Sequence, residues 1–376
     1  MENLADIIAG SLGLRRRRYG LALFQIKFIY YKRRRIVMED SPISLDGNVS
    51  SALEQDAELA ELHVHLGSAV DPAVMWEIAH AQGIKLPTKD YWSFVDMITA
   101  NPKRVKSFED YIALFKWTDL IQSSPIAVER SVYQTIAGAY RKNNITLLEL
   151  RFNPMKRNRG GEQDLDQIMM AAVRGLDRAS MEYPVKAGII ICLDRTFSYK
   201  LNEILVGKAL KYQNRGVVGI DIAGGRDSGF SYSHYKGLYK KARNGGLGLT
   251  VHAGEDEDYH SVQDVIASLE PDRIGHGVRS AEDEKTMEMI RERDITLEIC
   301  PSSNMHTGVI KDIEEMKVVF KALKSHGVEY TINTDGPEML MTNLRNEIAL
   351  LLKNGVLDKK DVLKANSRAF EASFME

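Results

Sequence analysis

The sequence predicts an α/β protein built as a (β/α)₈ TIM barrel with extra helices after strand 1. From residue 60 onward, eight short runs rich in Val, Ile and Leu alternate with longer stretches of helical periodicity. The runs are apolar almost throughout, which is typical of parallel strands that are buried on both faces. Eight strand–helix units are the number that closes a barrel of this kind.

The predicted strands are short, and several close on Gly, Asp or Asn, residues that favour turns. In chain order they are Glu61–Leu66, Thr146–Phe152, Val185–Leu193, Val217–Ala223, Leu247–His252, Arg273–His276, Thr296–Cys300 and Glu329–Asn333. About 80 residues separate the first run from the second, which is more than one crossover helix needs. Helical patterns at Pro72–Gln82 and Phe108–Ile121 therefore predict several helices in this gap.

The chain is expected to have two parts. Residues 56–376 contain no internal repeat or Pro/Gly-rich linker after Ala60, so we expect one barrel domain. Residues 1–55 are predicted to be a basic and apolar N-terminal extension, disordered or peripheral to the barrel. In it, basic clusters flank the apolar segment Tyr19–Tyr31. Three interpretations of this segment are open: a contact with a membrane surface or a polyanion, an organellar presequence, or an extension upstream of a true start at Met38.

Charge and cysteine content exclude several classes of protein. The formal net charge is −2, so no overall field attracts nucleic acid and no such partner is expected. No apolar run reaches the roughly 18 residues of a transmembrane helix. The two cysteines, Cys192 and Cys300, lie in apolar runs and form no disulfide framework, which indicates a reducing, cytoplasmic location. The oligomeric state stays open at this stage.

Polar residues gather where the predicted strands end, which is where barrels of this type carry their active sites. The first run ends in His63-Val64-His65, and alternate side chains of a strand share one face, so both imidazoles point the same way. Two imidazoles on one face form half of a divalent-metal site. Alone, this spacing is weak evidence, because a surface or core pair of histidines is more common.

Three further strand ends carry polar candidates. His252 and Glu255 follow the fifth run, His276 closes the sixth, and Asp335 follows the eighth. Each has an ordinary structural interpretation: His252 as a core histidine, Glu255 as a carboxylate at a helix entry, Asp335 as a helix N-cap. Their joint occurrence at matching strand ends favours a functional site instead.

The chemistry of this set indicates a hydrolase with one Zn²⁺ per chain. Three neutral imidazoles and one carboxylate hold zinc and leave a position for water, whose pKa falls towards about 7. Attack on an aromatic C–N centre also needs a proton donor for a ring nitrogen, a role that suits Glu255, and a proton acceptor, a role that suits His276. Asp335 can bind both the metal and the water. The fourth run carries no lysine that could bridge two metals, which predicts a single ion.

The motifs resemble those of the adenosine deaminase family, within the adenosine/AMP deaminase branch of the amidohydrolases. HVHL, HAGE, GHG, CPSSN and NTD occur in the family's order, from residue 60 to the C-terminus. By this resemblance, the zinc ligands are His63, His65, His252 and Asp335. Glu255 resembles the proton donor to purine N1, and His276 the residue that orients the hydroxide. Gly224 resembles the glycine whose backbone contacts purine N3.

Two departures from the family pattern concern the substrate. Gly67 stands where most members place an aspartate that binds the ribose 5′-hydroxyl, and Gly336 where most place an aspartate facing purine N7. A buried hydrogen-bond partner typically contributes about 1–3 kcal/mol. We therefore expect a 5′-modified adenosine, such as methylthioadenosine or aminodeoxyfutalosine, to be a better substrate than adenosine, with Gly67 leaving room beside the 5′ position.

The implied activity is hydrolytic deamination of an adenine-containing purine nucleoside to the inosine-type product and ammonia. One alternative is a deaminase of adenine or another heterocycle on the same scaffold. A second is a zinc-binding module without catalysis, which the presence of both Glu255 and His276 disfavours. Base deaminases of nucleic acids use a Cys-x-x-Cys zinc site, and the sequence contains none.

Overall fold

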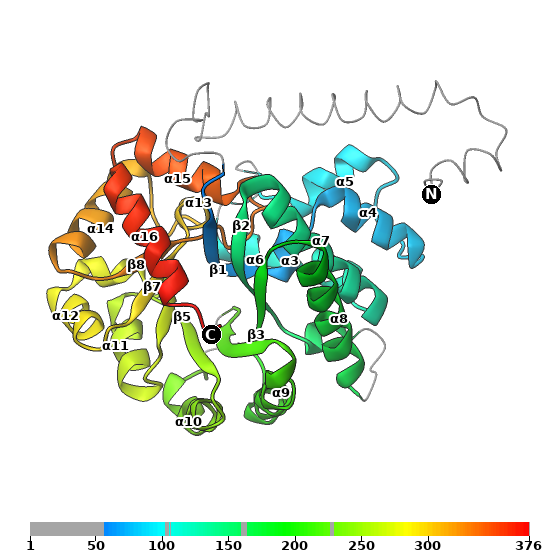
Figure 1. Ribbon diagram of the computed structural model, residues 1–376, viewed down its shortest axis with the longest axis horizontal. Helices are drawn as coiled ribbons and strands as arrows, with labels where there is room; N and C mark the ends of the chain where they lie inside the picture. Colours follow the sequence, from blue (N-terminus) through cyan, green and yellow to red (C-terminus); the bar gives the residue numbers. More distant parts are fainter. Residues whose placement is uncertain (1–55, 102–104, 106, 159–163, 226–228, 376) are drawn as a thin grey trace. The chain divides into compact units, whose positions relative to one another are not determined.

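The computed structural model describes residues 56–375 except 102–104, 106, 159–163 and 226–228. It confirms the predicted barrel: eight parallel strands pair in chain order, inside a ring of helices (Figure 1). The strands are β1 (Leu59–His65), β2 (Ile145–Phe152), β3 (Lys186–Asp194), β4 (Val217–Ala223), β5 (Gly248–Ala253), β6 (Arg273–His276), β7 (Thr296–Ile299) and β8 (Tyr330–Ile332). The predicted extension, residues 1–55, lies outside the described residues.

The extra helices after β1 are also confirmed. Four of them precede the crossover helix: α3 (Leu66–Ala69), α4 (Pro72–Ala81), α5 (Tyr91–Ile98) and α6 (Phe108–Ile121). The crossover is α7 (Pro125–Asn143), and the remaining main helices are α8 (Asp166–Glu182), α9 (Tyr199–Lys211), α10 (Lys236–Asn244), α11 (Tyr259–Ser268), α12 (Glu284–Glu292), α13 (Pro301–His306), α14 (Ile313–Ser325), α15 (Leu344–Lys353) and α16 (Lys359–Glu371). Side chains on α6 contribute to the site described below.

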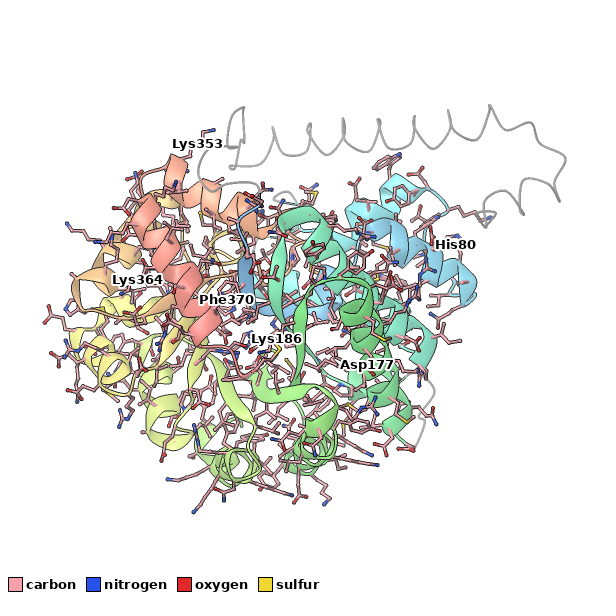
Figure 2. The ribbon with its side chains drawn as sticks, in the orientation of Figure 1. His80, Asp177, Lys186, Lys353, Lys364 and Phe370 are labelled. Atoms are coloured by element: carbon pink, nitrogen blue, oxygen red, sulfur yellow. The ribbon has the colours of Figure 1, made fainter. Side chains whose placement is uncertain are left out.

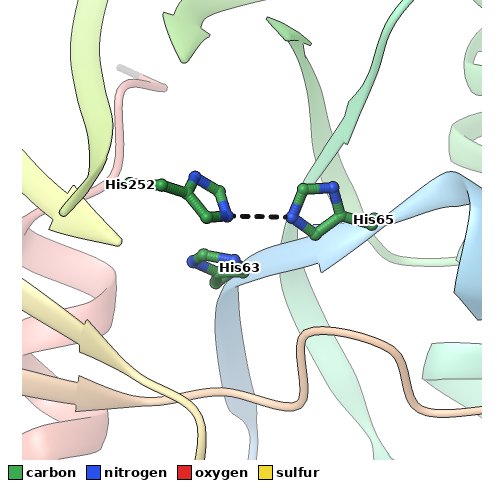
Figure 3. A group of neighbouring side chains, drawn as sticks. All are labelled: His63, His65 and His252. Atoms are coloured by element: carbon green, nitrogen blue, oxygen red, sulfur yellow. Dashed lines mark hydrogen bonds between the residues drawn. The ribbon is translucent and has the colours of Figure 1, made fainter. Parts of the chain in front are cut away.

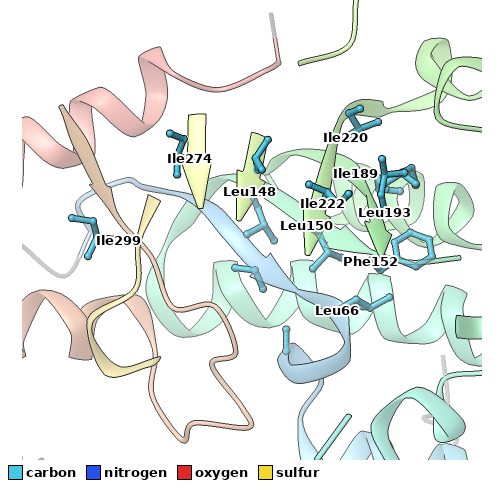
Figure 4. Close-up of a cluster of buried hydrophobic side chains, with 14 of the residues drawn as sticks. Leu66, Leu148, Leu150, Phe152, Ile189, Leu193, Ile220, Ile222, Ile274 and Ile299 are labelled. Carbon is cyan, nitrogen blue, oxygen red and sulfur yellow. The ribbon is translucent and has the colours of Figure 1, made fainter. Parts of the chain in front are cut away.

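Each strand is apolar on the face that packs against the helices. On β2, Leu148, Leu150 and Phe152 alternate along the strand (Figure 4). They join one large buried cluster that also contains helix residues such as Ile136 and Ile168. The period of two places these side chains on one face. Removal of so much apolar surface from water is the main stabilising contribution to the barrel.

The other strand face, inside the barrel, carries charged groups. Arg151 of β2 lies between Asp221 of β4 and Glu298 of β7, at 3.0 and 2.7 Å, and all three side chains have no solvent exposure. Arg273 of β6 pairs with Glu298 at 2.7 Å and also with Glu149. Buried charges are tolerated only when they are paired and hydrogen-bonded, as they are here. These ion pairs link strands on different sides of the barrel.

Closure of the barrel brings Asp335 beside β1. The backbone N–H of His65 donates to the Asp335 carbonyl (2.8 Å), and the N–H of Asp335 donates to the His63 carbonyl (2.9 Å). Both Asp335 (φ 63°) and His276 (φ 62°) have left-handed backbone conformations. This region is unfavourable for residues other than Gly and often marks functional sites.

Charged side chains cover the outside of the helix ring. Figure 2 labels examples, including Lys364 on α16 and Asp177 on α8, which are 68% and 45% exposed. Within the described part of the chain, no helix combines the length and apolar character needed to cross a bilayer.

Candidate active site

The residues predicted from the motifs meet at the carboxyl ends of the strands, around a cavity of about 300 Å³. Seven of them line it: His65, Gly67, Gly224, His252, Glu255, His276 and Asp335. His63 is fully buried and does not line the cavity, although its ring lies against the other imidazoles. Gly336 does not line the cavity either. A volume of this size falls in the range of small-molecule sites.

The orientation of His63 is set by Glu298, which comes from β7. The Nδ1 atom of His63 lies 2.7 Å from a Glu298 carboxylate oxygen. Burial would raise the pKa of Glu298, but Arg151 and Arg273 lower it to about 2, so this carboxylate only accepts hydrogen bonds. Burial lowers the pKa of His63 well below its ordinary value. The ring is therefore neutral, with its proton on Nδ1 and the lone pair of Nε2 facing the site.

His252 is oriented in the same way by Asp221. Its Nδ1 lies 2.9 Å from one carboxylate oxygen of Asp221 and 3.1 Å from the other. Burial would raise the pKa of Asp221, but His252 and Arg151 lower it below its ordinary value. Nε2 of His252 then faces Nε2 of His65 at 3.1 Å (Figure 3). Burial lowers the pKa of His65 well below its usual range, so this imidazole is neutral as well.

Asp335 presents one carboxylate oxygen to the imidazoles. Its Oδ2 accepts hydrogen bonds from the Ser303 hydroxyl (2.5 Å) and the Tyr111 hydroxyl (3.3 Å). Its Oδ1 lies 3.5 Å from Nε2 of His65 and 3.8 Å from Nε2 of His63. Burial raises the pKa of Asp335, and the Ser303 hydrogen bond opposes this effect.

These donor atoms fit a divalent metal ion. Nε2 of His63 is buried and has no hydrogen-bond partner among the described residues, which is costly unless a cation binds there. The three ring nitrogens of His63, His65 and His252 lie within 4.8 Å of one another. Zinc–nitrogen bonds of about 2.0–2.1 Å imply ligand separations of roughly 3.3 Å in a tetrahedral site, close to the distances found here. Three imidazoles and one carboxylate are also a ligand set that zinc accepts.

Glu255 and His276 lie together at the edge of this group. Nε2 of His276 is 3.5 Å from Oε1 of Glu255, and both side chains are at most 5% exposed. Burial raises the pKa of Glu255 well above its ordinary value, and the carboxylates of Asp335 and Asp256 act in the same direction. Burial also lowers the pKa of His276 well below its usual value. The pair thus consists of a carboxyl group that holds a proton and a neutral imidazole that can accept one.

The three glycines of the predicted substrate site differ in their surroundings. Gly224 has φ 95°, and an added Cβ would meet the Asp194 carboxylate at 3.0 Å. A Cβ on Gly67 would lie 2.8 Å from the Phe115 ring. The expectation that Gly67 leaves open room therefore needs correction, because Phe115 fills that space. Gly336 packs against Ser68, 2.8 Å from its would-be Cβ.

Several residues of the site were not identified from the sequence. Asp221 and Glu298 hold two imidazoles, and Ser303 holds Asp335. Asn304 contacts Nδ1 of His276 at 3.0 Å. The signal for the first two was a single charged residue within an otherwise apolar strand. Ser303 and Asn304 belong to the CPSSN motif, to which no roles had been assigned.

A parallel (β/α)₈ barrel with imidazoles and carboxyl groups at its strand ends has the arrangement of a barrel hydrolase suited to a divalent metal. Comparison with known proteins identifies the family within this class. The family model described as adenosine deaminase matches residues 59–376. The adenosine deaminase of Vibrio atlanticus (strain LGP32) is 30% identical over 314 residues, 84% of this chain and 92% of that relative. The chain therefore belongs to the adenosine deaminase family, and it is a hydrolytic deaminase of adenine compounds.

Solved structures share the fold at lower identity. The N6-mAMP deaminase of Arabidopsis superposes with a TM-score of 0.74 at 24% identity, covering 86% of this chain and 95% of that one. The adenine deaminase of Arthrobacter aurescens gives 0.75 at 18% identity, covering 85% and 94%. An amidohydrolase from Burkholderia ambifaria with bound Zn gives 0.77 at 19% identity, covering 89% and 91%.

Proposed function

We propose that the chain is a zinc-dependent deaminase of an adenine-containing nucleoside and that one Zn²⁺ is held by His63, His65, His252 and Asp335. The observation that carries this proposal is the convergence of four donor atoms: Nε2 of each histidine and Oδ1 of Asp335. When bound there, the ion would supply Lewis acidity and lower the pKa of a water molecule towards about 7.

The residues around this position divide the proton transfers between them. Glu255 holds a proton because its pKa is raised, and it donates this proton to a ring nitrogen of the base. His276 is neutral, so it orients the attacking water and accepts its proton. Water adds to the ring carbon that carries the amino group. The proton accepted by His276 then passes to the amino group, which leaves as ammonia, while the proton of the added hydroxyl returns to Glu255 as the C=O bond of the product forms. The buried setting strengthens each of these electrostatic contacts.

Gly224 supports the binding of a flat base at the cavity wall. Its left-handed backbone lies beside the Asp194 carboxylate, and any side chain at this position would meet that group. The bare backbone can therefore approach the ring closely. We assign Gly224 to the contact with the base, Gly67 to the sugar end, and Gly336 to support of Asp335 from outside the cavity.

The absence of a carboxylate at position 67 supports a 5′-modified adenosine as the preferred nucleoside. A free 5′-hydroxyl buried beside Gly67 finds no side-chain acceptor on that residue, so it loses a hydrogen bond that a modified group does not need. Adenine, the alternative substrate, would leave this end of the cavity empty.

The test is a comparison of ammonia release from adenosine, 5′-methylthioadenosine, aminodeoxyfutalosine, adenine and AMP by zinc-loaded protein. We expect turnover of at least one nucleoside or nucleotide to exceed that of adenine. Removal of the metal by a chelator should abolish this activity, and one equivalent of zinc should restore it. A preparation that releases ammonia from none of the five compounds would contradict the proposal.

A further inference from the structure

Arg157 is a buried cation with unused hydrogen-bonding capacity on the cavity wall. It ends the short helix η2 (Met155–Arg157), is 3% exposed and lines the cavity. Nη1 donates to the Asp119 carboxylate, whereas Nε is buried without a partner in the described part of the chain. Nη2 makes no hydrogen bond to any described residue. A guanidinium has five N–H donors, and unpaired donors in a buried position are costly unless a ligand satisfies them.

The position of Arg157 places it at the end of the cavity away from the reacting ring. Its Nη2 lies 3.2 Å from the point that a Cβ on Gly67 would occupy, next to β1. The groups that handle the base lie across the barrel from β1: Gly224 follows β4, Glu255 follows β5, and His276 ends β6. A substrate with its base between those groups therefore extends its sugar towards Arg157.

A second cation reinforces this end. Lys116 of α6 lines the cavity, is exposed, and has no ion-pair partner among residues 56–375 as described. Asp119 is already occupied by Arg157, and Lys156 pairs with Asp194 at 2.5 Å. Lys156 and Asp194 neutralise each other beside Gly224, so of the described residues Arg157 and Lys116 face a single carboxylate, Asp119, at the Gly67 end. Like-signed charge along a cleft of low dielectric raises the local concentration of an oppositely charged ligand.

We propose that Arg157 and Lys116 form a subsite for a negatively charged group at the 5′ position of the sugar. The inference rests on the proposed function and gives it a narrower substrate class: an adenine nucleoside that carries a 5′-phosphate or a 5′-carboxylate. Arg157 donates from Nη2 to an oxygen of this group, and Lys116 supplies a second charge from the rim. Gly67 leaves the guanidinium in place, because a Cβ there would lie 2.8 Å from the Phe115 ring and 3.2 Å from Nη2 of Arg157.

The first test compares kcat/KM for adenosine, 5′-methylthioadenosine, AMP and adenosine 5′-carboxylate on the zinc-loaded full chain. A hydrogen bond to a charged group predicts about 10- to 100-fold higher kcat/KM for one of the two anionic compounds than for adenosine. Its kcat/KM should fall as salt rises, while that of adenosine changes little. Comparison of AMP with adenosine 5′-carboxylate shows whether the subsite prefers a phosphate or a carboxylate. Equal or better use of adenosine or 5′-methylthioadenosine would overturn the subsite.

The second test uses variants. Arg157→Gln combined with Asp119→Asn removes the guanidinium without leaving a carboxylate unpaired, and it should reduce the preference for the anionic substrate at least about 10-fold. Lys116→Gln, at an exposed position, should weaken the salt dependence. The control is Arg215→Gln, which is 61% exposed and precedes β4 at the opposite end of the barrel. An unchanged preference in the double variant, or an unchanged salt dependence in Lys116→Gln, would contradict the roles of these cations.

A binding measurement separates this inference from the proposed function. Calorimetric titration of the zinc-loaded Glu255→Gln chain, in which kcat is expected to be about 10²–10⁴-fold lower, with AMP and with adenosine measures binding almost without turnover. If AMP binds more tightly than adenosine and the double variant loses this difference, the subsite is supported. If the parent chain nevertheless releases no ammonia, that second result contradicts only the deaminase mechanism. Turnover of all nucleosides without any 5′ preference would leave the mechanism standing and contradict only the subsite.

Discussion

Glu255 is buried, and the carboxylates of Asp335 and Asp256 lie nearby. Burial and these two negative charges raise the pKa of Glu255 well above its ordinary value. A carboxyl group that keeps its proton near neutral pH can act as a general acid. Glu255→Gln retains the shape of the side chain but removes the proton. We predict that kcat falls by about 10²–10⁴-fold while the metal stays bound.

Steady-state kinetics and elemental analysis of the same preparation check this prediction. Glu282→Gln, at a side chain that is 45% exposed on the surface, is the matched control and should behave as the parent chain. Near-normal turnover by Glu255→Gln would remove this residue from the mechanism.

Glu347 provides a prediction on stability. Burial raises its pKa to about 7, although the hydrogen bonds from Ser302 and Thr342 oppose this rise. The folded chain therefore holds this proton more tightly than the unfolded chain. The resulting stabilisation is complete below the ordinary value of 4.5 and is lost as the pH rises through about 7. Between pH 4.5 and about 7, the free energy of unfolding of the parent chain should therefore fall by about 1–3 kcal/mol more than that of Glu347→Gln.

Urea unfolding at pH 4.5 and pH 8 measures this difference. In Glu347→Gln, the amide oxygen can accept from the Ser302 N–H, and the amide nitrogen can donate to Thr342. Glu314→Gln, on a side chain that is 71% exposed, should keep the parent's pH dependence. Identical pH profiles for the parent and Glu347→Gln would show that this carboxyl group titrates normally.

At the scale of secondary-structure elements, side chains on the barrel strands hold the proposed metal ligands in position. Asp221 on β4 fixes His252, and Arg151 on β2 fixes Asp221 in turn. Partners of this kind typically contribute 10- to 100-fold in metal affinity. Asp221→Asn should weaken zinc binding by about that factor. It should do so without unfolding the chain, because Arg151 keeps Glu298 as a partner.

Competition with a chromophoric chelator measures the zinc affinity directly. The control is Asp177→Asn, on an α8 side chain that is 45% exposed. An affinity equal to that of the parent would show that His252 needs no orientation by Asp221.

The sequence predicted site residues best where a polar residue stands at the end of an apolar, strand-like run. His63 and His65 end an apolar run, and Asp335 follows another, so their positions could be predicted from strand periodicity. The pairing of Asp221 and Glu298 with their histidines could not be predicted. The partners lie on different strands, and no local sequence pattern specifies how the strands of a barrel align with one another.

The contribution of α6 was also outside the reach of sequence reasoning. Its helical pattern predicted Phe108–Ile121 correctly, but not that Tyr111 would reach Asp335 or that Phe115 would fill the space beside Gly67. These contacts depend on how the long segment after β1 packs over the strand ends. Periodicity identifies the buried face of a helix but not the element against which it packs.

At the scale of the whole molecule, the family match and the first described strand both begin at residue 59. We therefore predict that a chain starting at Met38 folds and turns over substrate as the full chain does. Thermal unfolding and kcat/KM of the two chains provide the comparison. Loss of solubility or activity on truncation would show that residues 1–37 contribute to the folded enzyme.

The central claim is that the convergent histidines and Asp335 hold one zinc ion that the deaminase requires. The most direct measurement is ammonia release from the preferred nucleoside or nucleotide as zinc is added to the metal-free chain. The structure predicts negligible activity without metal and a linear rise that ends at one equivalent of zinc per chain. Full activity in the metal-free chain, or a rise that continues to two equivalents, would contradict the account.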